Sequence, residues 1–365
     1  MWVRLLEAGA FRNLTFPQIT LSPGINILYG DNAQGKTNCL EAVYFCALGR
    51  TLRAEHCREL IPFNATHAQT SAEFCRDGEN TGFTIEAKVT QQSNKYMKSL
   101  MINRVPINNT RELFGRIPIV SFSPEDLRLI KAGPSERRRF MDIEICQLSP
   151  VYYQDLRTYH RTLRQRNHLL KTIQKDKSQA DALPIWDEQL TLYGTKIMKT
   201  RAAFITKIAQ LATEIHQEIT QDKETLQLQY KPAIPDINNY QATLLKNHQR
   251  DITMGITQAG IHRDDILFQV HGLNARAYAS QGQQRTAALS LKLAEIRLMY
   301  EKTGTLPILL LDDVFSELDH KRQQFLLHQI KNAQTLLTCT GLDDVASKIP
   351  DAGKIIEIKD GKVKR

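Results

Sequence analysis

A glycine-containing loop of eight residues, placed between an apolar run and a helical stretch, constrains this 365-residue chain more than any other feature. The run Ile25–Tyr29 favours a strand, and the residues from Gly35 to about Ala47 favour a helix. Glycines let a backbone curl until successive N–H groups point at an anion, and the following helix N-terminus adds partial positive charge. The loop therefore predicts a phosphate site. Its residues are Gly30, Asp31, Asn32, Ala33, Gln34, Gly35, Lys36 and Thr37.

The last two loop residues and a distant acidic pair suggest how a nucleoside triphosphate is bound and hydrolysed. We expect Lys36 to bridge the β- and γ-phosphates and the Thr37 hydroxyl to ligate Mg²⁺. The continuous apolar run 307–311 ends in Asp312 and Asp313, and such a run is typical of a central parallel strand. Asp312 is therefore expected to hold Mg²⁺, and Asp313 to position or deprotonate the attacking water.

The distance between these two motifs predicts the organisation of the chain. Lys36 and Asp312 are 276 residues apart, and residues recur at helical spacing from Ser135 to about Gln174 and again from about 184 to 221. These helices are expected to fold back antiparallel as an arm of roughly 40 Å. We therefore expect an α/β fold whose nucleotide-binding sheet is assembled from the N- and C-terminal segments around a helical insertion, with domain ranges 1–122, 123–250 and 251–365.

Positive charge is concentrated in the helical middle. The chain carries a formal net charge of +9, and the segment from Arg128 to Lys177 holds twelve Lys and Arg against five Asp and Glu. This excess favours polyanionic partners, although a solvated basic helix face gives the same pattern. Candidate contacts to a DNA backbone are Arg137, Arg138, Arg139, Arg157, Arg161, Arg164 and, nearer the N-terminus, Arg50 and Arg53, for which an exposed basic helix end is the alternative.

Composition excludes several other classes of protein. No stretch approaches the ~18 consecutive apolar residues of a membrane span, and the start Met1-Trp2-Val3-Arg4 leads into no apolar region followed by a small-residue cleavage site. The six cysteines include no Cys-x-x-Cys pair, which argues against a zinc site or a disulfide framework. The expected location is the cytoplasm, with no membrane partner.

Several further motifs follow one another in a fixed order. They are Phe11-Arg12-Asn13, Asn38 directly after the loop, Phe122-Ser123-Pro124-Glu125-Asp126-Leu127, Gly260 with His262-Arg263-Asp264-Asp265, Ser280-Gln281-Gly282-Gln283-Gln284-Arg285, and Leu311-Asp312-Asp313-Val314-Phe315-Ser316-Glu317-Leu318-Asp319. With them the chain resembles the SMC-like branch of ABC-type ATPases, and specifically the RecF family of bacterial DNA replication and repair proteins. The resemblance covers nearly the whole length.

The resemblance implies an ABC-type P-loop ATPase head with an inserted α-helical arm domain. It also implies that Ser280, Gly282 and Gln283 form the signature motif, which completes the γ-phosphate site of an opposite subunit so that ATP joins two heads. From the residues alone, Ser280 before the apolar-periodic helix 287–299 is equally well an ordinary helix N-cap. In this family pattern Asn38 belongs with residues 30–37 to the nucleotide site.

The resemblance further implies a recombination and repair function. A RecF-like chain would bind ATP and Mg²⁺, dimerise head to head, clamp duplex DNA beside single-stranded gaps, and help RecR and RecO load RecA for gap repair, replication restart and the SOS response. It would be associated with the nucleoid. Because Asp313 stands where most ABC ATPases carry a glutamate, one methylene longer, we expect slow hydrolysis, with ATP acting mainly as a dimerisation switch.

The chain also departs from common patterns, and alternatives stay open. Ala33 replaces a usual glycine, and the switch histidine of transporters is replaced near Thr338-Cys339-Thr340, which counts against a transporter nucleotide-binding subunit. An SMC-type chromosome organiser would need a far longer arm, and a GTPase is disfavoured because Asn94-Lys95-Tyr96-Met97 lacks the acid that reads guanine. The run 262–265 fits a structural turn as well as a nucleotide or DNA contact.

Overall fold

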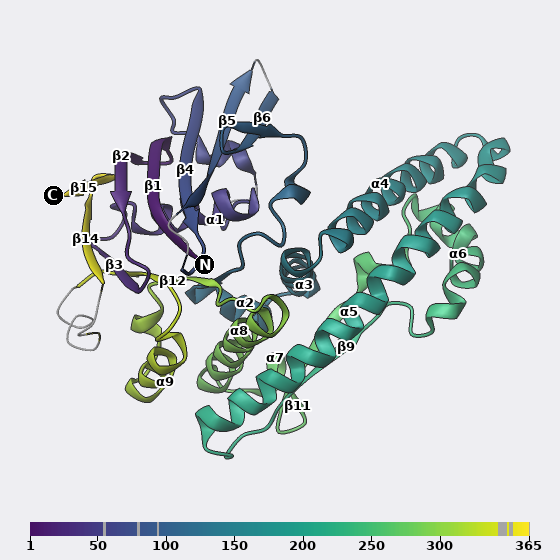
Figure 1. Cartoon of the computed structure of the whole chain (residues 1–365). Coiled ribbons are helices and arrows are strands. Elements are labelled where there is room, and N and C mark those ends of the chain that lie inside the picture. The colour runs from purple at the N-terminus through teal and green to yellow at the C-terminus, as the bar shows by residue number, and fades with distance from the viewer. Residues whose placement is uncertain (54–55, 79–80, 93–94, 342–348, 350–352, 365) are drawn as a thin grey trace. The chain divides into compact units, whose positions relative to one another are not determined.

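Two compact units are present in the computed structural model, which describes residues 1–365 except 54–55, 79–80, 93–94, 342–348, 350–352 and 365 (Figure 1). The first unit joins residues 1–126 to 295–365, and the second comprises residues 127–294. The expected ranges assign 251–294 to the C-terminal segment, whereas these residues cluster with the helical unit because β10 pairs with β9. Asn94 lies outside the described residues.

A mostly parallel six-stranded sheet carries the glycine loop in the first unit. Its strand order is β15-β14-β3-β13-β12-β8, so the two ends of the chain interleave. Every pair from β14 to β8 is parallel, whereas β15 returns antiparallel to β14. The strands are β3 (Ile25–Tyr29), β8 (Ile119–Phe122), β12 (Ile308–Asp312), β13 (Thr335–Cys339), β14 (Lys354–Lys359) and β15 (Lys362–Lys364). The prediction that one sheet is assembled from both ends of the chain is confirmed.

A second, antiparallel sheet has the order β2-β1-β4-β5-β6-β7. Helix α1 (Lys36–Leu48) contacts strands of both sheets, and eleven of its thirteen residues are buried, which explains why it is apolar on nearly every side. The strands are β1 (Trp2–Phe11), β2 (Leu14–Thr20), β4 (His67–Cys75), β5 (Gly82–Gln92), β6 (Lys95–Ile102) and β7 (Val105–Ile107). Helix α9 (His320–Ile330) lies between β12 and β13 in the chain.

Long helices dominate the second unit. A single residue, Ser149, separates α3 (Pro134–Leu148) from α4 (Pro150–Ile173). Helix α5 (Leu183–Thr220) extends over about 57 Å at ~1.5 Å per residue. Contacts of α4 with α5 run in opposite directions: Tyr152 meets Arg201, and Arg166 meets Asp187. The antiparallel pair is therefore confirmed. The other helices are α2 (Arg128–Lys131), α6 (Tyr240–Met254), α7 (Ala275–Tyr278) and α8 (Gln281–Thr303), whose last turns, from residue 295, belong to the first unit.

A small antiparallel sheet completes the second unit. It consists of β9 (Leu226–Lys231), β10 (Asp265–Val270) and β11 (Leu273–Asn274), with β10 in the middle. Short 3-10 turns join several elements: η1 (Cys57–Leu60), η2 (Thr110–Glu112), η3 (Pro124–Leu127), η4 (Lys177–Ala182), η5 (Ile237–Asn239), η6 (Ile261–Arg263) and η7 (Val314–Glu317). Within the described residues, none of the helices combines the length and apolar character that a membrane crossing needs.

Candidate nucleotide site

The glycine loop connects β3 to α1 with a left-handed backbone at three positions. Gly30, Ala33 and Gly35 have φ angles of +149°, +64° and +109°. A Cβ on Gly30 would lie 2.3 Å from the Ile358 carbonyl oxygen, so the first glycine is required by a close approach of β14. Ala33 adopts the left-handed conformation despite its side chain, at a cost of about 1 kcal/mol. The loop shape is therefore kept although Ala33 departs from the usual glycine.

The C-terminal hairpin of β14 and β15 is hydrogen-bonded to the glycine loop. In the β14–β15 turn, the Gly361 N–H donates to the Gln34 carbonyl oxygen at 3.0 Å, and the Asp360 N–H donates to Gln34 Oε1 at 2.6 Å. Asn13 contributes a further tie, because its Nδ2 donates to the Ala33 carbonyl oxygen at 3.3 Å and its Oδ1 accepts from Asn38 Nδ2 at 2.8 Å. The sequence gives no local signal for this contact, since Gln34 and Gly361 are far apart in the chain.

Lys36 lies at the start of α1 with its side chain folded against the loop. It is 8% exposed, and its Nζ donates to the carbonyl oxygens of Gly30 and Asp31, each at 2.7 Å. Burial lowers the pKa of Lys36 from its ordinary value, while Asp313, Cys339 and the other nearby acids act in the opposite direction. The ammonium group is thus held against the loop by two of the loop carbonyl oxygens.

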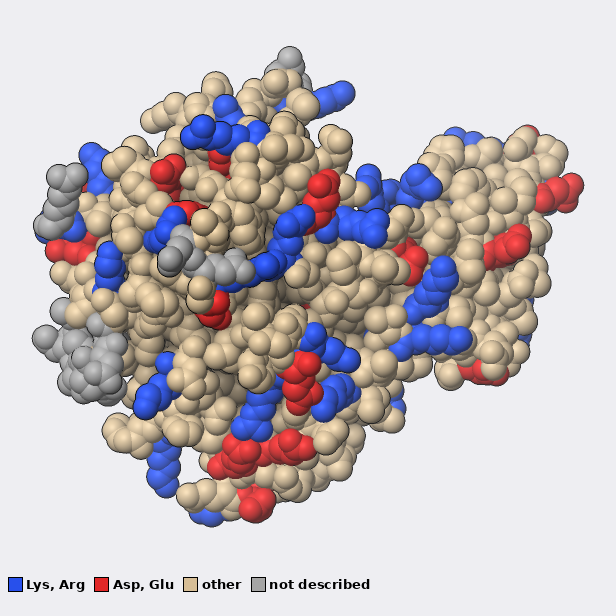
Figure 2. All heavy atoms as spheres, in the orientation of Figure 1, with Lys and Arg blue, Asp and Glu red and all other residues tan. Residues whose placement is uncertain are grey.

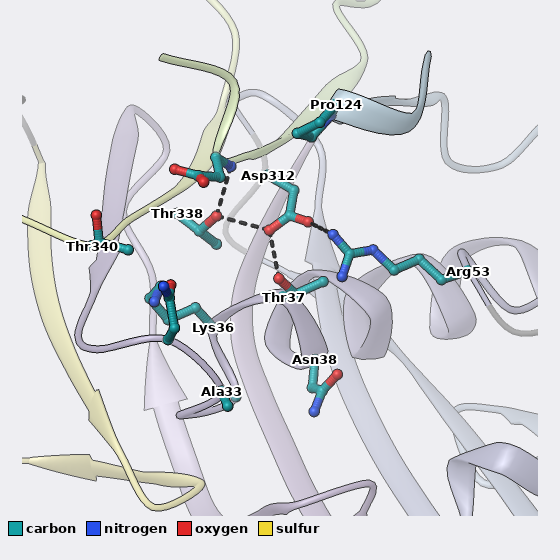
Figure 3. A pocket seen from close by; sticks show the side chains of 12 residues that line it. Ala33, Lys36, Thr37, Asn38, Arg53, Pro124, Asp312, Thr338 and Thr340 are labelled. Atoms are coloured by element: carbon teal, nitrogen blue, oxygen red, sulfur yellow. Dashed lines mark hydrogen bonds and ion pairs between the residues drawn. The ribbon is translucent and has the colours of Figure 1, made fainter. Parts of the chain in front are cut away.

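Asp312, at the end of β12, is buried, and its carboxylate contacts side chains from three other segments of the chain (Figure 3). Its Oδ1 accepts from Thr37 Oγ1 at 2.6 Å and from Thr338 Oγ1 at 2.9 Å. Its Oδ2 is paired with the Arg53 guanidinium. The Asp313 N–H donates to Thr338 Oγ1 at 3.0 Å, which fixes the turn after β12. Lys36, Thr37, Asp312 and Asp313 are therefore brought together.

The side chains of Lys36, Thr37, Asp312 and Asp313 line a cavity of about 320 Å³. Thr37 and Asp312 contribute a hydroxyl and a carboxylate, and hard oxygen donors of this kind suit Mg²⁺, which usually keeps several waters and takes few protein ligands. The donor set therefore fits Mg²⁺ together with a phosphate. The remaining lining residues are Asn32, Ala33, Gly35, Asn38, Arg53, Pro124, Thr338 and Thr340.

A second cavity, of about 830 Å³, lies next to the first and shares Asn38 with it. Arg12 lines it and is paired with the buried carboxylate of Glu41. Two aromatic side chains border it, Phe63, which is fully exposed, and Tyr96, which is 45% exposed. Arg12 belongs to the motif Phe11-Arg12-Asn13, whereas Phe63 lies in no recognisable motif and Tyr96 was named only in the run that disfavours a GTPase.

The Ser280 segment forms a helix start in the second unit. Gln283 N–H donates to Ser280 Oγ at 3.2 Å, while the Ser280 N–H donates to Gln283 Oε1 at 2.9 Å, which is a capping box. Ser280 and Gly282 are exposed, and Gln283 is half-buried. The N-cap interpretation is confirmed, and the segment also leaves its hydroxyl and the Gly282 backbone open to solvent at the start of α8. None of the three lines the cavity that contains Lys36.

The arginines proposed as DNA contacts separate into two groups. Arg137 is 5% exposed and donates to Asp265 and to two backbone carbonyls, so its assignment as a DNA contact is replaced by a packing role. Arg138 donates to the Asp264 carbonyl oxygen, Arg50 lies over the Phe114 ring, and Arg53 lines the Lys36 cavity. The exposed group comprises Arg139, Arg157, Arg161 and Arg164. On the face seen in Figure 2, basic side chains are spread over the α4 and α5 surface rather than packed into one patch.

The run 262–265 has a structural role within the second unit. Asp264 is fully buried and accepts from Arg201 Nη1 at 2.7 Å, from the Tyr230 hydroxyl and from the Ala233 N–H. His262 lies between the Tyr159 hydroxyl, 3.1 Å from Nδ1, and the Thr257 carbonyl oxygen, 3.0 Å from Nε2. The structural alternative that the sequence left open therefore accounts for His262 and Asp264, whereas Arg263 is exposed.

His262 gives a prediction about pH. Its pKa is lowered from 6.5 to about 4, chiefly by burial; the hydrogen bond to the Thr257 carbonyl opposes this shift, and the positive charges of Arg263, His160 and Arg138 add to it. Between these two pH values the unfolded chain binds a proton that the folded chain excludes, so stability is complete above pH 6.5 and declines on acidification. Chemical denaturation should show a loss of about 2 kcal/mol between pH 7 and pH 5 that is absent in His262→Gln.

The matched control for this experiment is His168→Gln, because His168 is exposed on α4. This variant should retain the pH dependence of the unmodified chain. Equal pH dependence in His262→Gln and in the unmodified chain would contradict the prediction.

The sequence matches known proteins over nearly the whole chain. The model of the RecF/RecN/SMC N terminal domain matches residues 2–354. The chain is 44% identical over 365 residues to the DNA replication and repair protein RecF of Lachnoclostridium phytofermentans, covering 100% of both chains, and 38% identical over 369 residues to that of Clostridium kluyveri, again covering 100% of both. The chain belongs to the RecF family. It is therefore a member of a family of DNA replication and repair proteins.

Solved structures support the same conclusion about the fold. A structure of the recombination mediator protein RecF with ATP in the RecFOR pathway matches with a TM-score of 0.92 and 34% identity, covering 100% of this chain and 97% of that one. The Smc head domain of Pyrococcus furiosus, at 17% identity and a TM-score of 0.55, covers 100% of this chain and 95% of its own and shares the fold alone. The predicted ABC-type ATPase head of the SMC-like branch is confirmed.

Proposed function

We propose that this chain is an ATP-dependent DNA-binding repair protein in which ATP acts as a dimerisation switch. The observation that carries the proposal is the convergence of Lys36, Thr37 and Asp312 on one cavity, although Asp312 is 276 residues from Lys36 in the sequence. The family and the ATP-bound RecF structure support ATP as the nucleotide.

In this proposal the loop backbone N–H groups bind the phosphates, and Lys36 leaves its two carbonyl partners to bridge the β- and γ-phosphates. Thr37 and Asp312 would hold Mg²⁺, which neutralises charge that develops on the phosphates during transfer. Asp313 orients the attacking water, and its short side chain favours slow hydrolysis. The nucleoside extends into the second cavity, where the Phe63 and Tyr96 rings offer stacking surfaces for the base.

Dimerisation would use the exposed helix start at Ser280. Its hydroxyl, the Gly282 N–H and the α8 N-terminus can bind the γ-phosphate held by a second copy of the chain. ATP then joins two copies by contacting both, and hydrolysis removes the shared ligand. This arrangement makes the ATPase heads a switch whose closed state depends on nucleotide.

The proposed DNA ligand is a duplex beside a single-stranded gap. The exposed basic residues Arg157, Arg161 and Arg164 follow one face of α4, where they can neutralise backbone phosphates. The ATP-bound relative acts in the RecFOR pathway, which supports joint action with RecR and RecO, and through them RecA loading at gaps in the nucleoid.

The decisive experiment measures mass by light scattering and binding to a labelled gapped duplex, with and without ATP and Mg²⁺. We expect the mass to double at micromolar protein and DNA affinity to rise at least about tenfold with ATP. Lys36→Met removes the phosphate cation and Ser280→Arg blocks the helix start, so each variant should stay monomeric. Lys321→Met, which removes an exposed lysine of α9, is the matched control and should behave like the unmodified chain.

Two outcomes would contradict this proposal. A chain that stays monomeric and binds DNA equally with and without ATP would contradict the switch. Co-fractionation with a membrane permease would instead support the transporter alternative.

A further inference from the structure

The carboxylate expected to hold Mg²⁺ already has a cationic partner within the protein. Asp312 Oδ2 pairs with Arg53, and Asp312 Oδ1 accepts hydrogen bonds from Thr37 and Thr338, so both oxygens are engaged (Figure 3). The carboxylate is buried, whereas the Arg53 side chain is 38% exposed. A buried carboxylate needs a counter-charge, and the guanidinium supplies it.

A divalent cation and a guanidinium compete for such a carboxylate. Mg²⁺ demands close oxygen ligands in near-octahedral geometry, and a second cation in hydrogen-bond contact with one of those ligands opposes its binding by direct repulsion. The Thr37 hydroxyl, which would be a second ligand, donates to the same Asp312 carboxylate. This hydrogen bond uses the Thr37 proton and leaves the lone pairs of its oxygen free for a metal, so the competition concerns the Asp312 carboxylate.

We propose that Arg53 is the resident counter-ion of Asp312 and must be displaced before Mg²⁺ can bind, which prevents metal loading in the absence of nucleotide. The inference rests on the proposed function, because it concerns the same site. Arg53 is suited to this exchange, since its exposed side chain can move into solvent while Thr338 keeps the carboxylate in place. Its backbone N–H faces Glu41 Oε1 at 3.5 Å, and Glu41 is itself paired with Arg12, so the main chain has a separate anchor.

The exchange gives metal binding a dependence on nucleotide. Phosphate oxygens add ligands and negative charge, which makes the metal able to compete with the guanidinium. Without nucleotide the metal gains one hydroxyl and one carboxylate but must break the ion pair. We therefore expect weak binding of a free divalent cation to the unmodified chain.

The test uses Mn²⁺, which can replace Mg²⁺ and whose free concentration is measured by electron paramagnetic resonance. Nucleotide-free protein is titrated as the unmodified full chain and as Arg53→Gln. Loss of the guanidinium should lower the half-saturating Mn²⁺ concentration by about tenfold. Arg53→Lys, which retains a cation, should stay close to the unmodified chain. In the double variant Arg53→Gln with Asp312→Asn, the gain in Mn²⁺ affinity should disappear.

Arg50→Gln is the matched control, because it removes one positive charge three residues away without touching Asp312; Arg50 lies over Phe114 instead. If Arg50→Gln and Arg53→Gln raise Mn²⁺ affinity equally, the effect is a general one of net charge and the proposal is overturned. Unchanged Mn²⁺ affinity in Arg53→Gln also overturns it.

A separate titration of the unmodified chain with a fluorescent ATP analogue in the presence of Mg²⁺ distinguishes failure of the proposed function from failure of the counter-ion role of Arg53. If this analogue fails to bind, the proposed function is wrong. If it binds while Arg53→Gln leaves Mn²⁺ affinity unchanged, only the counter-ion role is wrong.

Discussion

Replacing Gly361 with alanine is expected to weaken ATP binding by about tenfold and to lower the free energy of unfolding by about 3 kcal/mol. Gly361 has a φ of +69°, and a Cβ there would lie 1.8 Å from the Asn13 carbonyl oxygen. The β14–β15 turn would have to move away, and its two hydrogen bonds to Gln34 would be lost. Titration with a fluorescent ATP analogue measures the first effect, and chemical denaturation the second.

Gly304 provides the matched control for this substitution. Its φ is +70°, and none of the described residues comes within 4 Å of an added Cβ, so Gly304→Ala carries the same backbone strain without the clash. We expect Gly304→Ala to lose about 1 kcal/mol of stability and to bind ATP normally. Equal ATP affinity in the two variants would mean that the hairpin does not position the loop.

Replacing Arg201 with methionine is expected to destabilise the second unit by about 3–5 kcal/mol. Arg201 is 1% exposed and donates to Asp264, Asp142, the Tyr152 hydroxyl and the Ile261 carbonyl oxygen. Methionine fills part of the volume but leaves two carboxylates without their cation, one of them fully buried. Chemical denaturation followed by far-ultraviolet circular dichroism measures the loss.

Two further variants make this prediction specific. Lys199→Met removes an exposed cation from the same helix and should change stability by less than about 0.5 kcal/mol. Adding Asp264→Asn to Arg201→Met should recover part of the loss, because the buried negative charge is removed as well. A loss below about 1 kcal/mol for Arg201→Met would show that the buried charge network contributes little.

The sequence predicted those parts of the site whose signal is local. Lys36 and Thr37 lie in a motif with its own strand and helix, and Asp312 ends an apolar run, so spacing and hydrophobicity were sufficient. Arg53 was singled out as a DNA contact, but its contact with Asp312 spans 259 residues and gives no periodic pattern in the sequence. Thr338 was noticed only as the place where a histidine is missing, whereas its hydroxyl contacts both Asp312 and the Asp313 N–H.

The parts of the fold that were missed have physical reasons as well. The helices of the second unit were predicted because their apolar residues repeat at helical spacing, but a run of arginines cannot reveal which one is buried. Arg137 was therefore grouped with Arg139, although Asp265 and two carbonyls hold it inside. Strand β9 was overlooked because it directly follows a long helical block, despite its alternating buried and outward residues.

The position of β3 has a consequence for how the protein is made. In the sheet, β3 pairs on one side with β13 and on the other with β14. Both of these strands lie in the last 31 residues of the chain, 335–365. During synthesis the phosphate loop and its strand leave the ribosome roughly 300 residues before these partners exist. Such long-range pairing folds slowly and leaves apolar strands exposed in the meantime. A nascent or truncated chain is therefore expected to depend on chaperones until its final strands are available.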